Sequence, residues 1–237
     1  MFISATDLGF SSDPAIDNTP AWNAAIAAGG PDCIYLNGLF RFKTRPNPIL
    51  RPMRMEGANL NLSCLYRDYQ PLTLTEPFIE ARATFHLEKT SFNAPSGGQG
   101  IGLQFTGLAA SGSVYRDGYI SAAAGAHWAI PLSLQSSDSL GIRSCCIDNV
   151  ELFAATTHIL WLCNAQGLTM QGVDCYPAGG TVSHATIQGQ AGYRSAAINW
   201  TTRYLAQAYV YDTDNMTITG ISPASLSINN STNIRQL

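Results

Sequence analysis

One segment near the start of the chain repeats its apolar residues with a helical period. Within residues 19–28, Trp22, Ala25 and Ile26 fall on one face of a helix. A proline suits the first turn of this helix, and a Gly-Gly pair follows its last residue. The pattern predicts a short amphipathic helix whose apolar side requires an apolar surface to cover.

The rest of the chain alternates apolar and polar residues in short segments, and Gly, Ser, Asn and Pro separate these segments. A period of two is typical of β-strands. Residues 33–42 predict two strands around Asn37-Gly38, and residues 49–55 predict another strand that Gly57 ends. We expect strands to dominate about four fifths of the protein.

The strand segments repeat along the chain. Residues 145–152 (CCIDNVEL) align with residues 168–175 (LTMQGVDC) at an offset of 23, and these align with the segment from Met216 at an offset of 48. Apolar residues recur at the first, third and sixth positions, so the alternation skips one residue in each segment. The skipped residues are Asn149, Gly172 and Gly220. Because Asn and Gly tolerate the left-handed conformation, each predicts a corner that keeps the apolar side chains pointing inward.

A second set of apolar segments begins at Ile101, Ile130 and Ile159, at offsets of 29. In this alignment Trp161 falls inside an apolar run, which predicts a core position. Repeats of 23 to 29 residues with Asn or Gly corners are typical of a parallel β-helix, whose coils bury their apolar sides by stacking. A β-sandwich or jelly roll, the alternative, would need tight two-residue hairpin turns instead.

The fold class that these patterns predict is all-β, a parallel β-helix with a short N-terminal capping helix. We expect residues 1–32 to form the cap and residues 33–237 to form the β-helix, within a single domain overall. At roughly 25 residues per coil, the chain has room for about seven coils.

Composition narrows the function classes. Charged residues make up only 12% of the chain, the formal net charge is −3, and two of the thirteen basic residues are Lys. A cationic nucleic-acid surface is therefore not expected. No apolar stretch approaches the roughly 18 residues of a membrane span, and residues 1–10 lack the pattern of a signal peptide. We expect synthesis in the cytoplasm without membrane insertion. Six cysteines without metal-ligand spacing predict buried thiols, and no metal or other cofactor is expected.

The N-terminal third resembles a known superfamily. The matching segments are residues 6–10 (TDLGF), 17–28 (DNTPAWNAAIAA), 34–42 (IYLNGLFRF) and 52–59 (PMRMEGAN). They resemble the opening of the pectate-lyase-like right-handed parallel β-helix proteins, and most of all the version found in bacteriophage tailspikes and capsule depolymerases. Ser11-Ser-Asp-Pro stands where the superfamily usually has Gly-Asp-Gly, and the motif series of the polygalacturonases is absent, so the resemblance does not imply a pectin-degrading activity.

The resemblance implies a function at the bacterial surface. It implies a tailspike-like protein that binds bacterial surface polysaccharide, either capsule or O-antigen, with degradation by hydrolysis or by lyase action left open. It further implies a homotrimer in the virion, in contact with other phage tail proteins. Two alternatives remain: a non-catalytic structural or adhesive virion component, and a polysaccharide lyase or glycoside hydrolase of non-phage origin.

Three acidic residues are candidate catalytic groups. On a β-helix, outward-facing residues one coil apart lie about 4.8 Å apart, and those two coils apart about 9.6 Å. These spacings bracket the carboxylate separations of glycosidases. The 23-residue offset stacks Glu151 on Asp174, both pointing outward just after the corner, and places Asp148 just before it. The three are either catalytic acids or ordinary solvated residues of a polar ladder.

A further set of residues is predicted to bind the substrate. Aligning Gly118 with Asn149 would point Arg116 into the core, so either the register shifts there or Arg116 and Asp117 line a groove. Aromatic rings with a polar edge suit stacking on sugars. His158, just before a strand, is predicted to be a hydrogen-bonded turn residue. The predicted substrate-binding residues are Arg116, Asp117, Tyr119, Trp128 and Tyr176.

Overall fold

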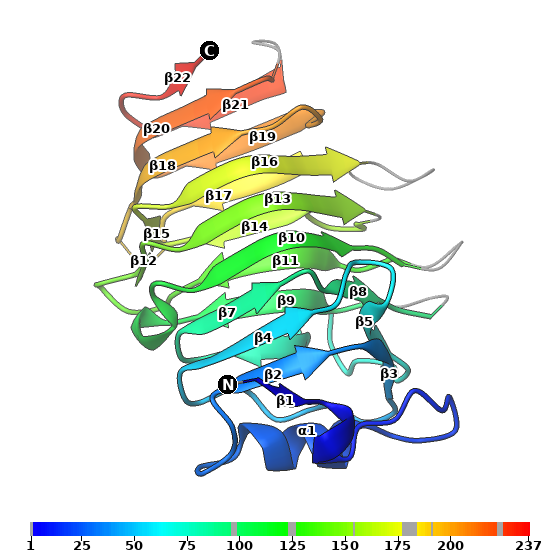
Figure 1. The fold of residues 1–237 in the computed structure, drawn as a ribbon. Coiled ribbons are helices and arrows are strands. Elements are labelled where there is room, and N and C mark those ends of the chain that lie inside the picture. Colours follow the sequence, from blue (N-terminus) through cyan, green and yellow to red (C-terminus); the bar gives the residue numbers. More distant parts are fainter. Residues whose placement is uncertain are drawn as a thin grey trace.

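The computed structural model describes residues 2–95, 99–122, 127–153, 155–176, 184–190, 192–221 and 225–237. Its strands wind in successive coils, and each pairs in parallel with the equivalent strand of the next coil (Figure 1). Two long sheets, here called sheet A and sheet B, enclose the interior. The predicted all-β, right-handed parallel β-helix with an N-terminal helix is confirmed.

Sheet A has 15 strands. Its strands are β1 (Ile3–Ser4), β2 (Cys33–Leu36), β3 (Gly38–Phe42), β4 (Met53–Gly57), β5 (Ser63–Arg67), β7 (Phe85–Glu88), β8 (Ser91–Asn93), β10 (Val114–Ile120), β12 (Ile142–Arg143), β13 (Cys146–Phe153), β15 (Ala165–Gln166), β16 (Thr169–Tyr176), β18 (Ser195–Thr201), β20 (Thr213–Thr219) and β22 (Arg235–Gln236). In the first coils two short strands stand where β10, β13 and β16 each run as one strand with a corner in it, and β10 pairs with both β7 and β8.

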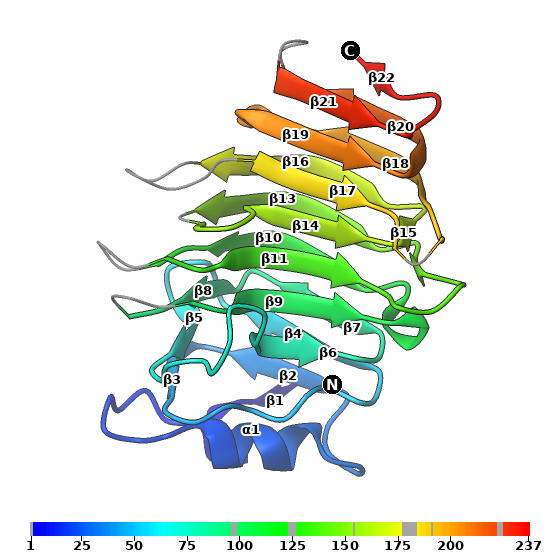
Figure 2. The same cartoon turned by 180° about the vertical axis from the view of Figure 1, so that it is seen from behind.

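Sheet B has seven strands, which agrees with the expected number of coils. Its strands are β6 (Pro77–Ala81), β9 (Ile101–Thr106), β11 (Ile130–Gln135), β14 (Leu160–Cys163), β17 (His184–Gln188), β19 (Gln207–Tyr211) and β21 (Leu226–Asn229). Figure 2 shows them stacked one above another from the other side of the molecule.

Helix α1 (Thr19–Ile26) lies across the N-terminal end of the stack (Figure 1). Its predicted apolar side is buried, and the Trp22 ring packs edge-on against Phe42 with ring centroids 5.7 Å apart. Two short 3₁₀ helices, η1 (Thr6–Leu8) and η2 (Leu108–Ala110), complete the helical elements of the described ranges. No helix in these ranges is long and apolar enough to cross a membrane. The division into a cap of residues 1–32 and a β-helix of residues 33–237 stays a prediction.

The corners lie where the sequence repeat predicts them. Strands β13 and β16 pair at an offset of 23, with Ile147 opposite Met170 and Val150 opposite Val173. All four side chains are buried. The corner residues have left-handed backbones, with φ of 52° at Asn149, 58° at Gly172 and 94° at Gly220. In β13 and β16 the left-handed residue bends the strand without changing which side chains face the core, and Gly220 comes directly after the end of β20.

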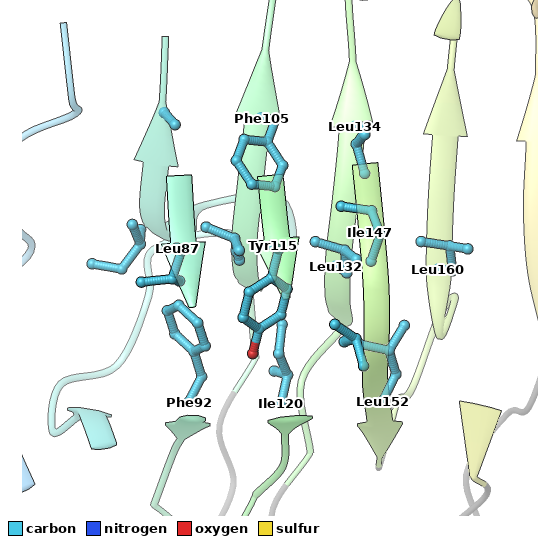
Figure 3. Close-up of a cluster of buried hydrophobic side chains, with 14 of the residues drawn as sticks. Leu87, Phe92, Phe105, Tyr115, Ile120, Leu132, Leu134, Ile147, Leu152 and Leu160 are labelled. Carbon is cyan, nitrogen blue, oxygen red and sulfur yellow. The ribbon is translucent and has the colours of Figure 1, made fainter. Parts of the chain in front are cut away.

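The core is filled from both sheets. Buried leucines of sheet B, such as Leu132 and Leu134 on β11, point into the interior, as do Ile147 and Leu152 of sheet A (Figure 3). Because every coil contributes to this interior, the coils stabilise one another by stacking.

Strand β14 differs from the prediction by one residue. Ile130 pairs with Ile101 at the expected offset of 29, but Leu132 pairs with Leu160 at an offset of 28. A shift of one residue turns every side chain of a strand to its other side. Leu160 therefore faces the core, and Trp161 lies half-buried on the outer side of sheet B. The prediction that Trp161 is a core residue is wrong.

Strand β10 takes the shifted register that the sequence allowed. Arg116 pairs with Asp148 and Gly118 with Val150, so Asp117 stands at the same place in its strand as the corner residue Asn149. Asp117 itself has a left-handed backbone, with φ of 48°. Arg116 therefore faces outward, so that its charge is not buried in the core.

The six cysteines are free thiols. Three are buried as expected, and three are half-buried. The buried ones are Cys145, Cys163 and Cys175, and the half-buried ones are Cys33, Cys64 and Cys146. Burial raises the pKa of the Cys145 thiol to about 11, so this group stays protonated and unreactive at neutral pH.

Candidate functional site

The predicted acidic residues lie on the outer side of sheet A, but one of them is covered. Glu151 and Asp174 are paired in register as expected. The turn after β18 folds over Asp174, so that this side chain is fully buried. The expectation that Asp174 faces solvent is therefore corrected. Glu151 remains half-buried beside it.

An arginine neutralises Asp174 from the covering turn. The Asp174 carboxylate accepts hydrogen bonds from the backbone N–H of Arg203 at 2.7 Å and from its Nε at 2.8 Å. A second guanidinium nitrogen, Nη2, lies 2.6 Å from the same carboxylate. These hydrogen bonds raise the pKa of Arg203. Because Arg203 occupies the carboxylate oxygens through its backbone N–H and its guanidinium, the geometry is that of a structural ion pair.

Asp148 is also paired. Its Oδ2 lies 3.2 Å from Nε of Arg116 on the neighbouring strand β10. Both side chains are partly exposed, so the pair contributes little to stability. The assignment of Glu151, Asp174 and Asp148 to catalysis stays a prediction. The ion pairs with Arg203 and Arg116 make a catalytic role less favourable for Asp174 and Asp148 than for Glu151.

Four of the five predicted substrate-binding residues lie on the same side as these acids. Asp117 accepts a hydrogen bond from Nδ2 of Asn149 at 2.8 Å, so it braces the corner. Tyr119 pairs in register with Glu151. Tyr176 stacks between Phe153 and Tyr204, with ring centroids 4.8 Å from each. The fourth residue, Arg116, forms the ion pair with Asp148 described above.

Trp128 is in the core instead. Its side chain is fully buried, and its Nε1 donates a hydrogen bond to the carbonyl of Ser121 at 2.6 Å. One ring face stacks on Phe78, with centroids 6.2 Å apart, and the guanidinium of Arg67 lies 4.3 Å from the ring centre. The prediction that Trp128 stacks on a sugar is wrong, because neighbouring side chains occupy the ring faces.

A second group of aromatic side chains lies on the outer side of sheet B. We call it the aromatic face, and its members are His158, Trp161, His184, Tyr209 and Tyr211. Ring centroids of neighbouring members lie 5.8 Å apart for His158 and Trp161, 5.3 Å for the two histidines, 5.0 Å for His184 and Tyr209, and 6.3 Å for the two tyrosines. All five are half-buried. They come from β14, β17, β19 and the turn before β14, so they span successive coils (Figure 2).

The aromatic face is electrically neutral at neutral pH. Burial, with a smaller contribution from the neighbouring His184, lowers the pKa of His158 to about 4. Burial also lowers the pKa of His184. Nδ1 of His158 lies 3.0 Å from Oγ1 of Thr186, which confirms the prediction of a hydrogen-bonded turn histidine. Trp161 packs against a small buried cluster of Ile101, Ala129 and Ile130, which holds its ring in place.

The outward positions next to these rings are also uncharged. Two ladders run along sheet B from β9 to β21. The first ladder consists of Gln104, Ser133, Trp161, Thr186, Tyr209 and Ser227, and the second of Thr106, Gln135, Cys163, Gln188, Tyr211 and Asn229. A neutral surface that combines ring faces with hydroxyl and amide groups is chemically suited to a ligand with an apolar face and a polar rim.

The sequence contained a signal for this surface. Leu160, Trp161 and Leu162 alternate, and reading them with a period of two would have placed both leucines inside and the tryptophan outside. The alternating tyrosines of β19, Tyr209 and Tyr211, give the same signal. The described part of the chain contains no group of three or more His, Cys, Asp or Glu side chains that could hold a metal ion.

No family model and no curated protein matches this sequence. Solved structures do resemble it. Geobacillus virus E2 ORF18 shares 12% identity over 92% of this chain and 52% of its own, with a TM-score of 0.50. The A-module of the Azotobacter vinelandii mannuronan C-5 epimerase AlgE4 shares 13% identity over 99% of this chain and 76% of its own, also with a TM-score of 0.50. Bacteriophage CBA120 tailspike protein 3 matches with 12% identity, over 99% of this chain and 57% of its own, and a TM-score of 0.35.

These likenesses concern the fold. The chain spans about half the length, 52%, of the virus protein that it matches. At identities of 12 and 13%, this structural similarity shows the fold alone. The chemistry of the site has to be argued from the residues of this chain. The chain therefore has the right-handed parallel β-helix fold that its sequence repeats and N-terminal motifs predict.

Proposed function

We propose that this protein binds a bacterial surface polysaccharide, capsule or O-antigen, on the aromatic face of sheet B. The observation that carries the proposal is the continuous row of rings from Trp161 through His158 and His184 to Tyr209, with neighbouring centroids 5.0 to 5.8 Å apart. Sugars present an apolar ring face and a rim of hydroxyl groups, and aromatic residues with a polar edge match both.

The wider setting is proposed from the sequence motifs. The N-terminal segments resemble those of phage tailspikes, so we propose a component of a phage virion that works as a homotrimer beside other tail proteins. One structure of similar fold is an epimerase that acts on mannuronan, as its name states, so the same architecture does serve a polysaccharide. The alternative of a non-catalytic adhesive component shares the binding step and differs only in the absence of cleavage.

Binding is tested by affinity electrophoresis in gels that contain capsule or O-antigen from candidate hosts. We expect at least one polysaccharide to retard the protein, and the Trp161→Ala variant to lose that retardation. Tyr176→Ala is the matched control, because it removes a half-buried outward ring from sheet A. Retardation that survives Trp161→Ala and disappears in Tyr176→Ala would move the site to sheet A and overturn the proposal.

The same mixtures test cleavage. If shorter oligosaccharides appear with the wild-type protein and not with Glu151→Gln, the predicted catalytic acid acts on the bound chain. Asp174→Asn is the companion variant, since it removes the carboxylate that Arg203 neutralises. Cleavage that both variants retain in full eliminates these acids as catalysts, and the absence of any product assigns the protein to the binding-only alternative.

A further inference from the structure

We infer that the aromatic face selects a neutral polysaccharide, a chain of sugars without carboxylate, phosphate or sulfate groups. This inference rests on the proposed function and names the substrate class of the same site. The two outward ladders of sheet B provide the evidence, because no position in them from β9 to β21 carries a formal charge.

An acidic sugar would need a cation at this surface. Proteins recognise carboxylates and phosphates mainly through Arg and Lys, with charge-assisted hydrogen bonds. A carboxylate placed against half-buried rings without such a partner loses hydration and gains nothing in return. The two histidines could supply positive charge only when protonated, and burial favours their neutral form.

Two groups of charged residues at the rim of sheet B are already paired within the protein. At the N-terminal end, Arg82 lies 2.6 Å from Glu80 on β6. At the other end, beside β19, Arg194 lies 2.5 Å from Asp214 and 3.6 Å from Asp212. That second cluster has two carboxylates for one guanidinium, so it repels an anionic chain more than it attracts one.

The arrangement of the rings also gives the direction of the chain. Trp161, Thr186 and Tyr209 occupy one ladder on three successive strands. The rings at its two ends are two coils apart, about 9.6 Å. A sugar chain that contacts both rings therefore runs along the β-helix axis, across the strands.

Stacking on uncharged rings is insensitive to salt, whereas an ionic contact at an exposed surface is screened by it.

The test uses purified capsular polysaccharides and O-antigens immobilised for biolayer interferometry, grouped into neutral chains and chains that contain uronic acid. At pH 7 we expect binding to neutral chains only, with affinities in 50 mM and 500 mM NaCl that agree within about twofold. Trp161→Ala should lower this affinity by at least tenfold, and the sheet A variant Tyr35→Ala, which removes an exposed ring from β2, should leave it unchanged.

Two results overturn the inference in different ways. Binding to uronate-containing chains that weakens tenfold or more in 500 mM NaCl, and that Trp161→Ala still abolishes, leaves the proposed site in place and refutes its neutral specificity. Binding that Trp161→Ala does not affect removes the proposed function, and the inference with it.

Discussion

The two sheets share one backbone geometry and differ in what they present to solvent. On sheet A the outward residues of β4 and β7 form a network of charges, in which Arg54 lies 3.2 Å from Glu56 and 3.2 Å from Glu88. Lys89 lies 2.8 Å from the same Glu56. On sheet B the outward ladders from β9 to β21 are neutral and the rings gather there. Coil stacking sets the spacing on both sides, so the difference lies entirely in the side chains.

The difference between the outer sides of the two sheets indicates which outer residues remain available to a ligand. On sheet A several acids pair with arginines, as Asp174 does with Arg203 and Asp148 with Arg116, so these charges are used within the protein. On sheet B, few groups within the protein compete with a ligand for the ring faces and the phenol hydroxyl groups. Counting acidic residues therefore directs attention to sheet A, whereas the half-buried, neutral rings direct it to sheet B.

The largest expected effect separates two tryptophans that the sequence did not distinguish correctly. Trp128→Ala should lower the free energy of unfolding by about 3–5 kcal/mol, because it opens a cavity beside Phe78 and Arg67. Trp161→Ala removes a half-buried outer ring and should cost only about 1 kcal/mol. Urea unfolding followed by circular dichroism measures both. Equal losses would show that the two rings are not divided between core and surface.

The next effect concerns the buried carboxylate of sheet A. Asp174→Asn should lower the free energy of unfolding by about 2 kcal/mol, because the charge-assisted hydrogen bonds to Arg203 are lost. Polysaccharide affinity should stay within twofold of wild type. Glu151→Gln, in the half-buried partner position, is the control and should change stability by less than about 0.5 kcal/mol. A variant with intact stability and lost binding would make Asp174 a ligand-binding group instead.

The smallest effect is the pH dependence of sheet B. The pKa of His158 is about 4 in the folded protein and rises to its ordinary value of 6.5 on unfolding. The unfolded chain therefore binds more protons between these values, and the free energy of unfolding falls as the pH drops from 6.5 towards 4. After allowance for solvent screening this loss is on the order of 1 kcal/mol. Urea midpoints at pH 7 and pH 5 should differ less for His158→Gln than for wild type, and equal differences would contradict the assignment.

Much of the fold could be predicted because it is written locally. An Asn or Gly at a corner, with inward residues on both sides of it, recurs between coils, so Asn149 and Gly172 identify the register of β13 against β16 without other information. The capping helix follows from Pro20 and the side that carries Trp22. These features depend on residues close together in the sequence.

The candidate site could not be predicted in the same way. The coil that leads from β11 to β14 is one residue shorter than a constant offset assumes, and that single residue decides that Trp161 faces outward. The burial of Asp174 depends on Arg203 in the next coil, and the burial of Trp128 on Arg67 two coils earlier. Such contacts between coils are set by the stacking, and no local pattern reports them.

Hydroxyl-radical footprinting with mass spectrometry shows whether the polysaccharide lies on sheet B. Both sheets carry outward aromatic rings that report on solvent access: Trp161, Tyr209 and Tyr211 on sheet B, and Tyr176 and Tyr204 on or over sheet A. With saturating polysaccharide, oxidation should fall at least threefold at the three sheet B residues and stay unchanged at the two others. Protection of Tyr176 and Tyr204 with unchanged oxidation of Trp161 would contradict the account.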